Sequence, residues 1–125
     1  MILADTSVWI DHLRSGDEGL AWRLSAGEIL THPHVIGELA LGNLARRHEI
    51  LHELGRLPHA VVADDAEVLH FIERNRLFGI GIGFIDAHLL ASVRLTPGAR
   101  LWTRDRRLAA AAERLGLAAV GSPEA

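Results

Sequence analysis

A chain of 125 residues, of which 49% are hydrophobic and 23% charged, is long enough to bury the core of one domain and has too apolar a composition for a disordered protein. It has no cysteine, which excludes disulfides, thiolate zinc sites and a cysteine nucleophile. The formal net charge of −3 argues against nucleic-acid binding through overall basicity, and all 13 basic residues are arginine, which excludes mechanisms that need a lysine, such as P-loop nucleotide hydrolysis.

The apolar pattern predicts strands that alternate with helices. The expected strands cover residues 2–4, 28–31, 60–63, 100–103 and 117–120. The expected helices begin after a cap at Thr6 or Ser7 and then cover residues 17–26, 33–41, 44–54, 64–76, 84–94 and 106–115. Short connections between them imply one α/β domain spanning residues 1–125, with a short parallel sheet flanked by helices on both faces and a frayed tail at about residues 121–125.

The N-terminus lacks the basic and apolar regions of a signal peptide, and every run free of charged side chains is too short to cross a membrane. We therefore expect a cytoplasmic protein with no membrane association.

Four acidic residues, far apart in sequence, stand at the edges of apolar segments: Asp5, Glu38, Asp86 and Asp105. Asp5 and Asp105 lie just past the ends of expected strands, and the crevice beyond the carboxyl ends of parallel strands is the usual ligand site of such sheets. Carboxylates that meet in one pocket repel each other unless a cation lies between them. Taken singly, each acid also fits a structural role as a helix cap or ion-pair partner. Taken together, they indicate a Mg²⁺ or Mn²⁺ site that serves phosphate chemistry.

The acids lie in four segments, which are residues 5–13 (DTSVWIDHL), 35–42 (VIGELALG), 83–91 (GFIDAHLLA) and 101–108 (LWTRDRRL). These segments resemble those of PIN-domain ribonucleases, and most closely the VapC-like toxins of toxin–antitoxin pairs. They occur in the same order and with similar spacing, and the resemblance extends from Met1 to about Val120.

The resemblance implies roles for individual residues. Asp5, Glu38, Asp86 and Asp105 would hold one or two divalent ions, Mg²⁺ or alternatively Mn²⁺. Thr103 and Ser7 match hydroxyl positions near the metal. Arg104, Arg106 and Arg107 flank Asp105 and would contact the RNA backbone, although surface arginines paired with acids are an equally good interpretation.

The activity implied by the resemblance is that of a toxin that hydrolyses RNA phosphodiester bonds with a metal-activated water, leaving 5′-phosphate and 3′-hydroxyl ends. Its partners would be the RNA substrate, a cognate VapB-like antitoxin and a second copy of the chain in a homodimer. In a further alternative, the chain is a non-catalytic PIN-like binding module whose apolar side chains line a groove. The side chains that belong either to this groove or to the core are those of Trp9, Leu13, Trp22, Leu24 and Leu41.

A competing motif occurs at His48-Glu49-Ile50-Leu51-His52, which matches the zinc-protease pattern H-E-x-x-H. The longer metzincin pattern fails, because Pro58 stands where the third ligand belongs and Met1 is the only methionine. We therefore treat zinc proteolysis as a remote alternative.

The loop at residues 79–83 (GIGIG) lacks the spacing of a dinucleotide fingerprint and is interpreted as a tight turn before the Asp86 helix.

Overall fold

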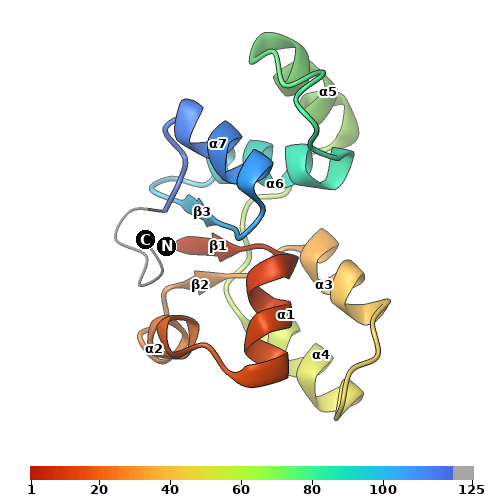
Figure 1. Ribbon diagram of the computed structural model, residues 1–125, viewed down its shortest axis with the longest axis vertical. Coiled ribbons are helices and arrows are strands. Elements are labelled where there is room, and N and C mark those ends of the chain that lie inside the picture. Colours follow the sequence, from red (N-terminus) through yellow and green to blue (C-terminus); the bar gives the residue numbers. More distant parts are fainter. Residues whose placement is uncertain (120–125) are drawn as a thin grey trace.

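The computed structural model describes residues 1–119, which form a small parallel sheet and seven helices (Figure 1). The strands are β1 (Ile2–Ala4), β2 (Ile29–Leu30) and β3 (Arg100–Trp102). The helices are α1 (Thr6–Ser15), α2 (Glu18–Ser25), α3 (Pro33–Ala40), α4 (Arg47–Arg56), α5 (Asp65–Arg74), α6 (Phe84–Leu95) and α7 (Arg106–Arg114). None of these helices has the length and apolarity that a membrane span requires.

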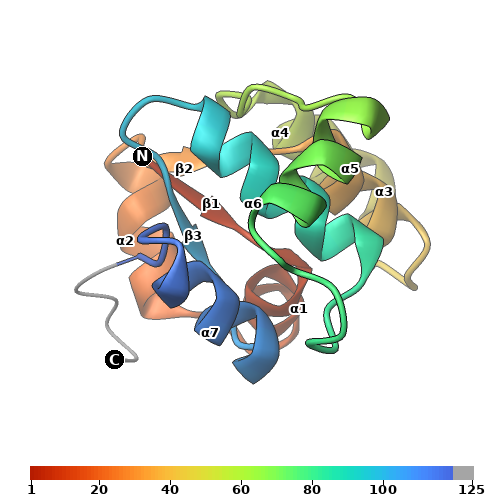
Figure 2. The same ribbon diagram turned by 90° about the horizontal axis from the view of Figure 1, so that it is seen from above.

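The first strand, β1, is the centre of the sheet, whose order is β2-β1-β3 with both pairings parallel. Leu3 pairs with Leu30 on one side and with Leu101 on the other, and all three are buried. Short strands of mainly apolar residues are typical of parallel sheets covered on both faces. Figure 2 shows helices on both sides of the strands, which confirms the predicted α/β architecture.

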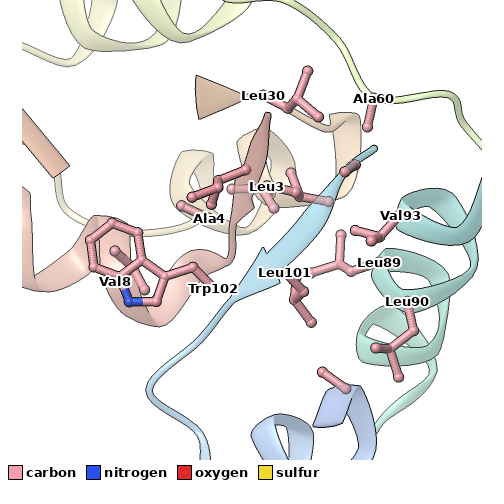
Figure 3. Packing of buried hydrophobic residues seen from close by; sticks show 14 of the residues in the cluster. Leu3, Ala4, Val8, Leu30, Ala60, Leu89, Leu90, Val93, Leu101 and Trp102 are labelled. Atoms are coloured by element: carbon pink, nitrogen blue, oxygen red, sulfur yellow. The ribbon is translucent and has the colours of Figure 1, made fainter. Parts of the chain in front are cut away.

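The core joins the strands to α6. Leu3 and Leu101 belong to one cluster with Leu89 and Val93 of α6, as Figure 3 shows. Helix α6 is the most deeply buried helix, with every residue from Ala87 to Val93 buried. Because Asp86 immediately precedes this buried stretch, the core fixes the position of its backbone.

Two predicted strands are replaced by isolated bridges among the described residues. Residues 60–63 form no strand: the bridge beside them joins Thr31 to His59, and the backbone N–H groups of Val61 and Ala63 donate to hydroxyl groups around α6. The Val61 N–H donates to Thr96 Oγ1 (2.9 Å) and the Ala63 N–H to Ser92 Oγ (3.3 Å). At the other edge, residues 117–119 make one bridge to β3, from Leu101 to Ala118, and Val120 lies outside the described residues.

Two predicted helix starts also differ. The cap of α1 is the Asp5 side chain, not Thr6 or Ser7. The helix expected at residues 44–54 begins at Arg47, after Arg46 adopts a left-handed conformation with φ of 52°. The Arg47 guanidinium donates to the carbonyls of Ala40 (2.5 Å) and Gly42 (3.2 Å), which holds the α3–α4 loop in place of a longer helix.

Candidate active site

Asp5 lies at the carboxyl end of the central strand, where it caps α1. Its Oδ1 accepts from the backbone N–H groups of Ser7 (3.0 Å) and Val8 (3.3 Å) and from Ser7 Oγ (2.5 Å), while its Oδ2 accepts from Thr103 Oγ1 (2.5 Å). Only 6% of the residue is exposed. Burial raises the pKa of Asp5, and the hydrogen bonds from Ser7 and Thr103 oppose this shift.

The two hydroxyl groups around Asp5 connect the ends of β1 and β3. Ser7 Oγ donates to Asp5 and accepts from the Arg104 N–H (3.0 Å), and Thr103 Oγ1 donates to Asp5 and accepts from the Asp105 N–H (3.0 Å). Each hydroxyl is therefore oriented from both sides. Both side chains that the sequence suggested as auxiliary hydroxyls contact Asp5 directly.

Asp86 stands in the first turn of α6, half-buried, with its Oδ2 accepting from the Gly83 N–H (3.1 Å). Burial raises the pKa of Asp86 most, and the negative charges of Asp105, Asp5 and Glu38 raise it further, against the Gly83 hydrogen bond. The four acids thus share one electrostatic environment, although up to 100 residues separate them in sequence.

Asp105 and Glu38 are more exposed than the other two acids. Asp105 caps α7 through Oδ1, which accepts from the N–H groups of Arg107 (2.9 Å) and Leu108 (3.1 Å). Glu38, near the end of α3, accepts through Oε1 from Thr6 Oγ1 (2.8 Å). The second oxygen of each carboxylate makes no hydrogen bond to residues 1–119, so it is available to a ligand.

The donor set fits a hard divalent cation, because it consists of carboxylates whose mutual repulsion such an ion relieves. Among the described residues, however, no three His, Asp or Glu side chains already lie close enough to hold one ion together. The carboxylates influence one another's charge without touching, because Coulomb interactions extend well beyond metal–ligand distances. Binding an ion would therefore require these side chains to move closer together.

The three arginines near Asp105 have different surroundings. The Arg104 guanidinium forms ion pairs with Asp11 (2.7 Å) and Asp17. This pairing ties the end of β3 to α1 and the start of α2 and gives Arg104 a structural role. Arg106 and Arg107 are exposed in the first turn of α7.

The His-Glu-x-x-His motif lies on the exposed surface of α4. His48 and His52 are both exposed, and Glu49, which would be the general base of a zinc protease, is ion-paired with Arg46 at 2.6 Å. No group of three His, Asp or Glu side chains within residues 1–119 makes a metal site here either. The geometry therefore gives the motif no support.

A groove of about 580 Å³ lies between α1, α3 and α4, and Glu38 lines it. Its other lining residues are Ile10, Leu13, Arg14, Leu39, Gly42, Asn43, Leu44, Ala45, Arg46 and Ile50. Of the five candidates for an apolar groove, only Leu13 lines it, since Trp9 is buried in the core, Leu24 packs against the core, and Trp22 and Leu41 are exposed elsewhere. The spacing of Ile10, Leu13 and Arg14 on one helix face is the signal that could have identified the groove from the sequence.

The model of the PIN domain family matches residues 2–114. The chain therefore belongs to the PIN domain family. It is 51% identical over 118 residues to a protein named Ribonuclease VapC32 from two strains of Mycobacterium tuberculosis, CDC 1551 / Oshkosh and ATCC 25618 / H37Rv. Each match covers 94% of this chain and 95% of the relative. The resemblance seen in the four acidic segments is confirmed at the level of the family and of a VapC-like relative.

Proposed function

We propose that the protein is a metal-dependent endoribonuclease that acts as the toxin of a toxin–antitoxin pair in the cytoplasm. One observation supports this most directly. The half-buried Asp86 carboxylate shares its electrostatic environment with Asp5, Glu38 and Asp105, which is the arrangement that metal-dependent phosphodiester hydrolysis needs. The similarity to Ribonuclease VapC32 points to RNA as the substrate.

In the proposed mechanism, Asp5 and Asp86 would be direct ligands of Mg²⁺ or Mn²⁺, while Glu38 and Asp105 would bind the ion through water or orient the nucleophile. When bound, the ion lowers the pKa of water for in-line attack on phosphorus and stabilises the leaving 3′ oxygen. The hydroxyls of Ser7 and Thr103 hold the Asp5 carboxylate in one orientation. Products should carry 5′-phosphate and 3′-hydroxyl ends.

The RNA backbone is proposed to lie across the first turn of α7, where Arg106 and Arg107 are exposed. Arginine forms bidentate hydrogen bonds to phosphate. Of the three arginines suggested by the sequence, Arg104 is the weakest candidate, because its guanidinium is already paired with Asp11 and Asp17.

The groove between α1, α3 and α4 is the proposed docking site of a VapB-like antitoxin. Its walls include apolar side chains such as Ile10, Leu13 and Leu39, and Glu38 connects it to the acidic site. An antitoxin segment seated here could extend a cationic side chain to the carboxylates, which would compete with the metal. A homodimer is proposed on family grounds alone.

The test is cleavage of total and structured RNA by the purified protein with Mg²⁺, Mn²⁺ or EDTA. Wild type is compared with Asp86→Asn and with the double variant His48→Ala/His52→Ala. Metal-dependent cleavage that is lost only in Asp86→Asn supports the acidic site and argues against zinc proteolysis. A folded wild type that binds RNA or an antitoxin but cleaves nothing with either metal would instead favour the non-catalytic binding module.

A further inference from the structure

In the loop between α5 and α6, one glycine lies against a side chain of another helix. Gly81 has φ of 84°, a left-handed conformation that favours glycine. A methyl group added at Gly81 would lie 2.6 Å from Arg107 Nη1 and 2.8 Å from Arg107 Cδ. The Arg107 side chain of α7 therefore lies directly against the Gly81 backbone, in the space that a side chain at position 81 would occupy.

Both partners of this contact are attached to the acidic site. The loop ends at Gly83, whose N–H donates to Asp86 Oδ2 (3.1 Å), and the Arg107 N–H donates to Asp105 Oδ1 (2.9 Å). Figures 1 and 2 show the segment between α5 and α6 beside the start of α7. The Arg107 side chain thus spans the two elements that carry Asp86 and Asp105.

The Arg107 guanidinium also remains available to a ligand. It makes no ion pair with the described acids, unlike Arg104, which is held by Asp11 and Asp17. A guanidinium that lies against the loop leading to Asp86, and that the described acids do not neutralise, can hold a phosphate at the edge of the site. No comparable contact is present for Arg106 among residues 1–119.

We propose that Arg107 binds an RNA phosphate adjacent to the scissile bond and that Gly81 is the positioning residue that seats its guanidinium. The proposal rests on the proposed ribonuclease function, because it assigns the substrate phosphate to that same site. It predicts that a side chain at position 81 weakens RNA binding by displacing Arg107, while the four acidic side chains keep their positions.

Gly79 offers a matched control within the same loop. Its φ is 72°, close to that of Gly81, but an added methyl group would meet nothing within 4 Å. Gly79→Ala and Gly81→Ala therefore introduce the same kind of backbone strain, and only Gly81→Ala disturbs Arg107.

The experiment measures RNA binding by fluorescence anisotropy in the Asp86→Asn background with EDTA, so that the readout does not depend on cleavage. Arg107→Ala and Gly81→Ala should each weaken binding about tenfold, the value of one lost charged hydrogen bond, while Gly79→Ala stays within about twofold. Arg107→Ala should also reduce the salt dependence of log K by about 0.7, as expected for one lost phosphate contact on a single strand. The double variant Gly81→Ala/Arg107→Ala should bind no more weakly than Arg107→Ala alone.

Three results would overturn the proposal: unchanged binding by Arg107→Ala, equal losses in Gly79→Ala and Gly81→Ala, or additive losses in the double variant. If Gly81→Ala does not fold, Arg107→Lys replaces it as the test. Lysine keeps the charge but not the bidentate guanidinium, so the proposal predicts weaker RNA binding by Arg107→Lys. In the catalytically intact background, Arg107→Ala should raise KM and leave kcat nearly unchanged. Failure of wild type to cleave RNA would refute the ribonuclease and still leave the binding test of Arg107 valid.

Discussion

Asp86→Asn should weaken metal binding without lowering the stability of the metal-free fold. In the metal-free protein, the pKa of Asp86 is raised by burial and by three neighbouring carboxylates. The folded state therefore binds the Asp86 proton more tightly than the unfolded state, so the ionised group lowers stability at neutral pH, and this penalty fades as pH falls through the raised pKa. Asparagine removes the charge, and its amide oxygen can still accept from the Gly83 N–H. We expect the metal-free variant to melt no lower than wild type.

When metal is added, wild type should gain more stability than Asp86→Asn. Metal at about 100 times its Kd stabilises the folded state by about 2.7 kcal/mol. With 125 residues and an unfolding entropy of about 2.1 cal/mol/K per residue, this corresponds to a rise in Tm of about 10 °C. If losing the Asp86 ligand weakens affinity about 100-fold, the same metal concentration stabilises by only about 0.4 kcal/mol, or a rise of less than about 2 °C.

The assay is thermal unfolding in EDTA and in a titration of Mg²⁺ or Mn²⁺, followed by circular dichroism. Glu73→Gln is the matched control, because Glu73 is an exposed carboxylate of α5 outside the acidic group, and its variant should keep the full shift. An Asp86→Asn protein that shows the wild-type shift would refute the assignment of Asp86 as a ligand. A wild type that shows no shift with either metal would refute the metal site.

Three further predictions concern side chains other than the four acids. Thr103→Val should lower the free energy of unfolding by about 1–3 kcal/mol, because it removes the hydroxyl that donates to the buried Asp5 carboxylate, whereas Thr103→Ser should not; equal urea-unfolding midpoints for the two variants would contradict this. Burial lowers the pKa of His32 from 6.5 to about 4, so the stability that its neutral form contributes is present above pH 6.5 and is lost as pH falls toward 4. Between pH 7.5 and 5 this loss should reach about 2 kcal/mol, and a Tm series of His32→Gln should lack it; parallel pH profiles of variant and wild type would show the reasoning to be wrong. The double variant His48→Ala/His52→Ala should cleave RNA within about threefold of wild type, because surface substitutions away from a site have small effects, and loss of cleavage in a folded protein would reopen the zinc alternative.

Much of the acidic site could be predicted because each aspartate has a local signature. Asp5 and Asp105 cap the helices that begin one residue later, and Asp86 bonds the backbone at Gly83, three residues before it. These interactions span two or three residues, so a short stretch of sequence is enough to predict them. The same holds for β1, whose three apolar residues end at Asp5.

The failures have a common cause, which is competition from distant partners. The pattern at residues 60–63 is that of a buried strand, but Thr96 and Ser92 of the α6 region accept its backbone hydrogen bonds. In the sequence, Arg104 is a basic residue next to the candidate metal ligand Asp105, but Asp11 and Asp17, about 90 residues earlier, bind its guanidinium. Neither partner can be recognised from the local sequence.

The sequence by itself determined the α/β class and the central strand and predicted the group of four acids, because hydrophobic period and helix caps act over a few residues. Only the tertiary structure decided which groups surround those acids. It showed that Glu38 accepts from Thr6, that the groove of α1, α3 and α4 reaches Glu38, and that Arg107 lies against Gly81. These contacts depend on how the helices pack around the sheet, and packing is set by the whole core rather than by any one segment.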